Sequence, residues 1–177
     1  MPKPFPMRPS NFRLIPELVG VHLPKASGTY ALVIHIDRGS LVSVGALGQQ
    51  PFDRGWYIYC GSAMGAGGQG LRSRILRHLS KSKKKRWHID HLLASEAARI
   101  HMVFFAKSRS NRECDLAKSL LRMNGSDVPV DGFGSSDCRS DCPAHLVRLH
   151  FRTSDEVEEA LAEAFRKLEL RYRVLKS

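Results

Sequence analysis

At 177 residues, the chain is long enough for one domain with a buried core and short for two full domains. Its 42% hydrophobic content argues against a wholly disordered protein, and no apolar run reaches the roughly 18 residues that a membrane helix needs. The formal net charge of +11 favours polyanionic partners, with nucleic acid first.

The composition changes twice along the chain, which predicts three parts. Most of the nine prolines fall in residues 1–27, which we expect to form an extended arm that packs on the domain through Phe12, Leu14 and Ile15. Residues 28–151 are expected to form the main domain, and residues 152–177 a C-terminal helix packed on it. The first residues lack the apolar segment of a secretory signal, so we expect a cytoplasmic protein with no membrane partner and reduced cysteines.

Strand patterns dominate the first half of the domain. Residues 30–36 (YALVIHI) form an apolar run, and the Asp-Arg-Gly-Ser sequence after it is typical of a turn. We expect residues 41–44 to return as a second strand and to form a hairpin with the first. Residues 56–60 are a third strand.

Helical periodicity follows. Residues 71–80 place Leu71, Ile75 and Leu79 on one face, which predicts an amphipathic helix. Further expected elements are a helix over 89–95, a strand over 100–106, a helix over 111–122 capped by Asn111, and a strand over 145–151. The last helix begins at a capping box in which Thr153 is the N-cap and Glu156 the third helical residue.

A glycine-rich turn separates the third strand from the first helix. Gly65, Gly67 and Gly70 match the G-x-G-x-x-G pattern of dinucleotide-binding proteins. That pattern also requires a second strand ending in an acid, whereas the segment before Asp90 is basic and lacks an apolar strand. The sequence therefore favours a dinucleotide-dependent enzyme least.

Phosphodiester chemistry fits the residues on both sides of that turn better. Arg74 and His78 are four residues apart, so they project from one side of a helix. Tyr59 lies at the end of the strand that leads to them. An arginine binds phosphate oxygens in a bidentate manner, and a tyrosine or histidine can handle a proton. Packing of Tyr59 in the core and a solvated basic helix face explain the same spacing almost equally well.

Three motifs resemble those of the GIY-YIG nucleases: Gly28-Thr29-Tyr30, Tyr59-Cys60-Gly61-Ser62 and Arg74-x-x-x-His78. Trp87-His88-Ile89-Asp90, Arg112-Glu113-Cys114 and residues 132–138 (GFGSSDC) are similar to a stand-alone branch of that superfamily, the Uri-type endonucleases. The resemblance covers roughly residues 25–150.

The resemblance implies a small α/β (α+β) domain with a central three-stranded antiparallel sheet and flanking helices. Here the first two motifs are farther apart than is usual in the family, which indicates an extra hairpin-like insertion. The implied activity is hydrolysis of DNA by an endonuclease with one Mg²⁺ or Mn²⁺.

The resemblance also implies roles for single residues. Tyr30 and Tyr59 would be active-site tyrosines, Arg74 would stabilise charge on the phosphate, and His78 would assist proton transfer or hold phosphate. Glu113 best matches the metal carboxylate; Glu96 is its rival and Asp90 the third candidate. A protein that kept the fold without the metal acid would instead be a non-catalytic nucleic-acid-binding module.

Two further features bear on binding. We expect DNA contacts from the basic helix and the run that follows it, namely Arg72, Arg77, Lys83, Lys84, Lys85, Arg86 and Trp87. Cys138, Cys142 and His145 have the ligand types for structural zinc, with Cys114 or Asp137 as the fourth ligand. The spacing is not a standard zinc motif, so a metal-free turn is the favoured interpretation.

Overall fold

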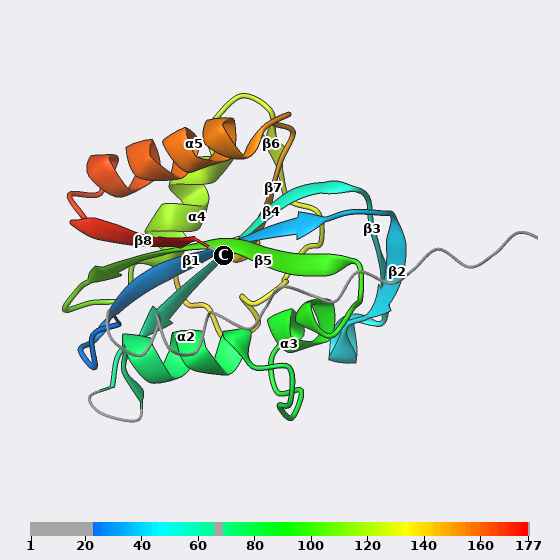
Figure 1. The fold of residues 1–177 in the computed structure, drawn as a ribbon, viewed down its shortest axis with the longest axis horizontal. Helices are drawn as coiled ribbons and strands as arrows, with labels where there is room; N and C mark the ends of the chain where they lie inside the picture. Colours follow the sequence, from blue (N-terminus) through cyan, green and yellow to red (C-terminus); the bar gives the residue numbers. More distant parts are fainter. Residues whose placement is uncertain (1–22, 66–68, 177) are drawn as a thin grey trace, which may run out of the picture.

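A six-stranded antiparallel sheet organises the computed structural model, which describes residues 23–65 and 69–176 (Figure 1). The strand order is β6-β7-β4-β1-β5-β8, and every neighbouring pair is antiparallel. The strands are β1 (Gly28–Ile36), β4 (Gly55–Ala63), β5 (Ala98–Lys107), β6 (Ser126–Asp127), β7 (Leu146–Leu149) and β8 (Tyr172–Lys176). Separately, β2 (Ser40–Ser43) and β3 (Gln49–Phe52) pair with each other, joined through the short 3₁₀ helix η1 (Gly45–Leu47).

Helices cover both faces of the sheet. Figure 1 shows α2 (Leu71–Leu79) and α3 (His88–Leu93) on one face, and α4 (Glu113–Leu121) and α5 (Ser154–Lys167) on the other. No helix among the described residues is both long and apolar enough to cross a membrane. The expected α/β class with an antiparallel sheet is confirmed.

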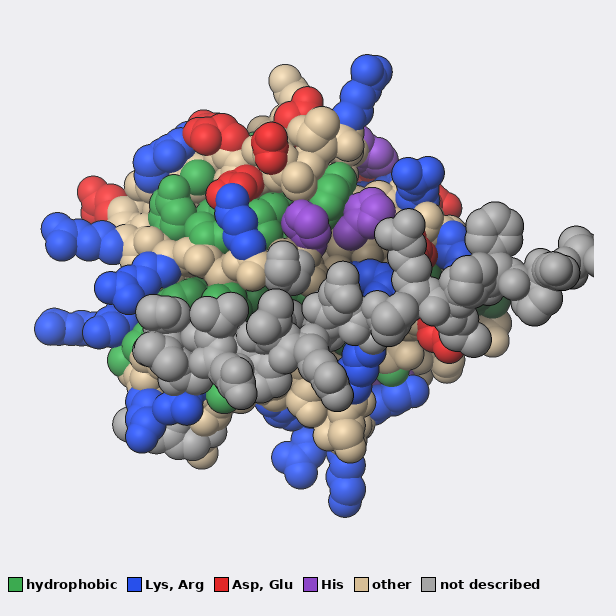
Figure 2. All heavy atoms as spheres, in the orientation of Figure 1, with side chains coloured by type: hydrophobic (Ala, Val, Ile, Leu, Met, Phe, Trp, Pro, Cys, Tyr) green, Lys and Arg blue, Asp and Glu red, His purple; other side chains and the backbone are tan. Residues whose placement is uncertain are grey.

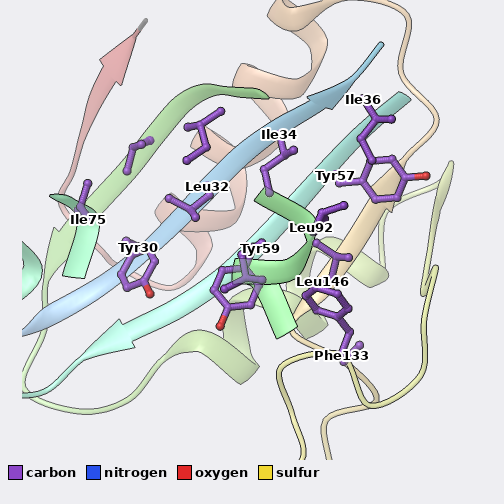
Figure 3. Close-up of a cluster of buried hydrophobic side chains, with 14 of the residues drawn as sticks. Tyr30, Leu32, Ile34, Ile36, Tyr57, Tyr59, Ile75, Leu92, Phe133 and Leu146 are labelled. Carbon is purple, nitrogen blue, oxygen red and sulfur yellow. The ribbon is translucent and has the colours of Figure 1, made fainter. Parts of the chain in front are cut away.

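Alternate residues of β1 belong to two separate cores. Leu32 and Ile34 pack on the α2 and α3 side, in the cluster of Figure 3, whereas Ala31 and Val33 pack on the α4 and α5 side. Because all of these side chains are buried, the strand reads as a continuous apolar run rather than an alternating one. The central position of β1 follows from this pattern.

The predicted hairpin between residues 30–36 and 41–44 is wrong. β1 pairs with β4 and β5 along its whole length, and β2 pairs with β3 instead. The apolar nine-residue β1 needs long partners, and β2 has only four residues, of which Leu41 is exposed. The insertion between the first two motifs is thus a small hairpin of its own.

The sheet is also wider than the three strands predicted. β4, β1 and β5 form its centre, β7 and β6 extend one side, and β8 extends the other. The end of the chain was expected to be helical, but residues 172–176 form β8, which pairs with β5. Glu169, with φ of 56°, lies in the reversal between α5 and this strand.

Helix starts were predicted with mixed success. The capping box of α5 is confirmed: Thr153 Oγ1 accepts a hydrogen bond from the Glu156 backbone N–H, and the Glu156 carboxylate accepts one from the Thr153 N–H. For α4, the N-cap is Arg112 rather than Asn111, and no side chain caps it. Glu113 therefore occupies the first position of that helix.

The segment before β1 completes the start of α2. The backbone N–H groups of Leu71 and Arg72 donate to the carbonyls of Ala26 and Pro24, which satisfies two donors that a helix leaves free at its N-terminus. A Cβ on Gly70 would lie 2.4 Å from the Lys25 carbonyl oxygen, so this close approach requires glycine. Most of the predicted arm, with Phe12, Leu14 and Ile15, lies outside the described residues, as does Gly67.

Candidate functional site

A pocket of about 440 Å³ opens beside β4, where its pairing with β7 ends. β7 pairs with β4 from Trp56 to Tyr59, and Gly61 and Ser62, farther along β4, line the pocket. Side chains from both sheet faces and from the loop of residues 128–145 reach it. Its lining includes Tyr30, Tyr59, Ser62, Arg74, Trp87, Glu113, Cys114, Asp137, Cys138, Arg139 and His145.

Strand register brings the two tyrosines together. Tyr30 on β1 lies opposite Gly61 on β4, and both tyrosine hydroxyls point out of the apolar cluster on the same side (Figure 3). A Cβ on Gly61 would lie 2.4 Å from the Tyr30 ring carbon Cζ. The glycine two residues after Tyr59 therefore makes room for the tyrosine of the first motif, which explains the spacing of both.

His78 lies behind Tyr30 rather than in the pocket lining. Its Nε2 is 2.8 Å from the Tyr30 hydroxyl, and the side chain is almost completely buried. Burial lowers the pKa of His78 to about 3, with the nearby Lys83 charge adding to the effect. Burial, together with Tyr59, raises the pKa of Tyr30 well above its ordinary value. The pair is therefore a neutral phenol hydrogen-bonded to a neutral imidazole.

His78 should make the protein sensitive to mild acid. The unfolded histidine takes up a proton near pH 6.5, but the folded one does so only near pH 3, so the unfolded state binds more protons in between. The free energy of unfolding should fall, through this group, by at most about 1.4 kcal/mol per pH unit as the pH drops below 6.5. Urea unfolding between pH 7 and 4.5 measures the slope. His78→Gln should flatten it, and equal slopes in wild type and His78→Gln would contradict the assignment.

Arg74 and Arg77 leave the same helix but have different surroundings. The Arg77 guanidinium makes a bidentate ion pair with Asp90 at 2.8 Å for both contacts, which uses its donors within the protein. Arg74 lines the pocket, with its guanidinium carbon 4.5 Å from the centre of the Trp87 ring. Arg77 also stacks on Trp87, so the indole holds both arginines in place.

Of the three predicted metal carboxylates, Glu113 is the one that lines the pocket of the tyrosines. It lines the pocket and accepts a hydrogen bond from the Ser62 hydroxyl on β4. Glu96 lies in a separate depression, with an almost fully exposed side chain paired to Arg38. Asp90 is fully buried by Arg77; burial alone would raise its pKa, but hydrogen bonds from Arg77, Arg86 and Trp87 lower it to about 2.

The predicted DNA-contact residues fall into two groups. Lys83 is half-buried, and its Nζ donates to the His78 carbonyl at the end of α2, so it acts as a helix C-cap, while Arg77 pairs with Asp90. Lys84, Lys85 and Arg86 are exposed, and Arg72 is partly so.

Several pocket residues were not singled out from the sequence. Ser62 donates a hydrogen bond to Glu113. It follows Gly61 on β4, so its side chain points to the opposite face of the sheet from that position, and knowledge of where the strand ends would have been enough to identify it. Asp115, Arg139 and Ser140 also line the pocket, but their positions depend on how the chain folds across it, for which the sequence carries no local signal.

A cysteine–histidine cluster forms one wall. The donor atoms of Cys114, Cys138, Cys142 and His145 all lie within 4.8 Å of one another. Of the two candidates for the fourth position, Cys114 joins the cluster; Asp137 lines the pocket nearby.

The chain belongs to a family described as "Domain of unknown function DUF123", which matches residues 29–170. No curated protein and no solved structure gives a significant match to the chain. Because that family description carries no activity, the function has to be inferred from the site.

Proposed function

We propose that the protein is a metal-dependent endonuclease that hydrolyses phosphodiester bonds in DNA through a GIY-YIG-type site. The observation that carries the proposal is the convergence of Tyr30, Tyr59, Arg74 and Glu113 on one pocket. These residues come from β1, β4, α2 and α4, so only the folded chain unites them. The central β4-β1-β5 arrangement supports a relationship to the GIY-YIG fold.

Arg74 is the group that binds the scissile phosphate. Its guanidinium lines the pocket, and stacking on Trp87 fixes its plane in advance. A preorganised guanidinium stabilises the extra negative charge that the phosphate gains as water attacks. Trp87 on this view positions Arg74 rather than stacking on a DNA base.

Tyr30 and Tyr59 orient the attacking water. Burial raises the pKa of both phenols, and the low pKa of His78 opposes formation of an imidazolium, so neither tyrosine carries a stable negative charge in the free protein. The hydrogen bond between Tyr30 and His78 holds the Tyr30 hydroxyl in place. In the reaction, the water oxygen bonds to phosphorus and releases one proton to solvent, one ester P–O bond breaks, and the leaving oxygen takes up a proton from solvent.

The Glu113 carboxylate and the Ser62 hydroxyl share the pocket with Arg74, and oxygen ligands of this kind suit a hard divalent cation. The Glu113 carboxylate would hold Mg²⁺ or Mn²⁺, with phosphate oxygens and waters as its other ligands. When bound, such an ion supplies Lewis-acid stabilisation and a more acidic water. Ser62 keeps the Glu113 side chain directed to the pocket through its hydrogen bond.

A plasmid-nicking assay tests the proposal. Supercoiled DNA, branched DNA and single-stranded RNA would be incubated with the protein and Mg²⁺ or Mn²⁺, with parallel samples in EDTA. Nicking or cleavage of DNA that EDTA abolishes is the expected result. If the protein binds DNA but cuts none of these substrates with either metal, the alternative of a non-catalytic binding module holds.

DNA affinity should depend on the exposed basic segment after α2. Figure 2 shows Lys and Arg side chains along the lower edge of the molecule, below α2, and acidic side chains at the opposite edge, over α5. Lys84→Gln, Lys85→Gln and Arg86→Gln together should weaken binding to all sequences. The slope of log K against log salt should become shallower by about 0.9 for each DNA phosphate that the variant no longer neutralises.

Lys83 stays unchanged in that variant because it caps α2. The matched control neutralises Arg166, Lys167 and Lys176, which pair with glutamates of α5. Fluorescence anisotropy across a salt series measures both variants. An unchanged slope in the first variant, or an equal change in the control, would place the DNA elsewhere.

A further inference from the structure

We infer that Cys114, Cys138, Cys142 and His145 bind one structural zinc ion that fixes the loop of residues 128–145 to the start of α4. This metal is separate from the Mg²⁺ or Mn²⁺ of the proposed reaction, and its test does not depend on cleavage. Four observations support this zinc site: the spacing of the donor atoms, the contacts around them, the length of the loop and the position of the cluster.

The donor atoms have the spacing of a zinc tetrahedron. The Sγ atoms of Cys114 and Cys138 are 3.0 Å apart, Cys114 Sγ is 3.2 Å from His145 Nε2, and no pair in the cluster exceeds 4.8 Å. With Zn–S bonds of about 2.3 Å, the edges of a tetrahedron are roughly 3.8 Å, inside this range. Three sulfurs and one imidazole are soft to borderline donors that suit zinc and not Mg²⁺.

A hydrogen bond to sulfur and a nearby positive charge suit a thiolate-rich metal site. The backbone N–H of Ser140 donates to Cys138 Sγ at 3.4 Å, a bond that stabilises a thiolate. His145 is held through its backbone, with its N–H bonded to the Phe133 carbonyl and its C=O to the Cys60 N–H. Lys118 Nζ bonds the Ser140 carbonyl, which places a positive charge beside a site whose zinc and three thiolates sum to −1.

The loop of residues 128–145 is long for a segment that a metal ion would cross-link. Residues 128–145 contain no helix or strand, and a stretch of this length without secondary structure is uncommon inside a compact domain. Asp141, between two of the cysteines, has φ of 51°, in the left-handed region that Asp adopts more readily than most residues other than glycine. A zinc ion held by Cys114 of α4 would tie this loop to the regular part of the fold.

The position of the cluster shows what the zinc would do. Cys114 directly follows Glu113, and Cys138 and His145 line the same pocket. In the same loop, Gly134 packs on the Tyr59 ring. Four protein ligands leave no open coordination position, so the zinc is structural and shapes the wall of the pocket without acting on a substrate.

Metal content tests the inference. The full-length protein, purified under reducing conditions without chelators, should contain about one zinc per chain by mass spectrometry. Replacement by Co²⁺ should give the strong visible absorption of a tetrahedral thiolate site. Removal of zinc with a high-affinity chelator should lower the Tm by about 5 °C or more.

Two variants make the test specific. Cys138→Ser should lose the zinc and the cobalt spectrum, because Cys138 is a partly exposed ligand whose replacement disturbs packing little. Cys60→Ala removes a buried cysteine outside the cluster and should keep one zinc. A wild-type protein that binds neither zinc nor Co²⁺, a Cys114–Cys138 disulfide in the reduced preparation, or full zinc retention by Cys138→Ser would overturn the inference.

Discussion

Glu113→Gln should reduce DNA cleavage at least about 1,000-fold and leave DNA binding intact. The glutamine side chain has nearly the same shape and its oxygen can still accept the hydrogen bond from Ser62, so the change removes mainly the negative charge that holds the divalent ion. Initial rates of plasmid nicking and anisotropy titrations on the same DNA measure the two properties. Binding should be unchanged or tighter, because one negative charge leaves the pocket.

Glu96→Gln is the matched control, since it makes the same chemical change at the rival carboxylate. Glu96 pairs weakly with Arg38 at 3.7 Å and does not line the pocket of the tyrosines. Its variant should cut at the wild-type rate. If Glu96→Gln lost activity and Glu113→Gln kept it, the metal assignment would move to the second depression. The zinc content should be the same in both variants, which checks that Cys114 next to Glu113 is undisturbed.

Asp90→Ala should lower the free energy of unfolding by about 3–5 kcal/mol. The carboxylate is completely buried and accepts hydrogen bonds from both Arg77 nitrogens and from the backbone N–H groups of Arg86 and Trp87. Its removal leaves the Arg77 charge without its partner and frees the start of α3. For a chain of this length, the loss corresponds to a fall in Tm of about 10 °C.

Asp115→Ala gives the comparison for Asp90. Asp115 pairs with Arg112 three residues away on the surface of α4, and its side chain is about half exposed, so its loss should cost less than about 1 kcal/mol. Thermal unfolding of both variants at pH 7 measures the difference. If Asp90→Ala melted within about 2 °C of Asp115→Ala, roughly 1 kcal/mol, the buried pair would not stabilise the fold as its burial and hydrogen bonds imply.

Three polar residues of α2 show what a local sequence pattern can predict. The sequence places Arg74, Arg77 and His78 on one short helix, and α2 does span them. It does not reveal that Arg77 turns to Asp90, that His78 is buried behind Tyr30, or that Arg74 alone of the three lines the pocket. Periodicity reports which faces of a helix are apolar; it carries no information on which distant side chain meets each polar residue.

The spacing of the cysteines in the sequence likewise predicts only part of the cluster. Cys138, Cys142 and His145 are close in sequence, so their grouping is foreseeable, but the choice of Cys114 over Asp137 depends on where α4 packs against the loop. The wrong hairpin prediction has a similar origin. The turn after β1 was correctly placed, but β1 pairs with β4 and β2 pairs with β3. Strand length and the burial of both faces of a strand decide such pairings, and the strands concerned can be tens of residues apart in the sequence.

By itself, the sequence determined the α/β class, the apolar strand at residues 30–36, the capping box of α5 and the residue types suited to phosphate chemistry. Such features depend on residues that lie close together in the sequence, so their pattern can be recognised without knowledge of the fold. The tertiary structure alone decided the register that sets Tyr30 opposite Gly61, the six-stranded width of the sheet, and the meeting of Arg74 with Glu113 in one pocket. Those depend on long-range pairing and packing, whose outcome is fixed only when both faces of the sheet are covered at once.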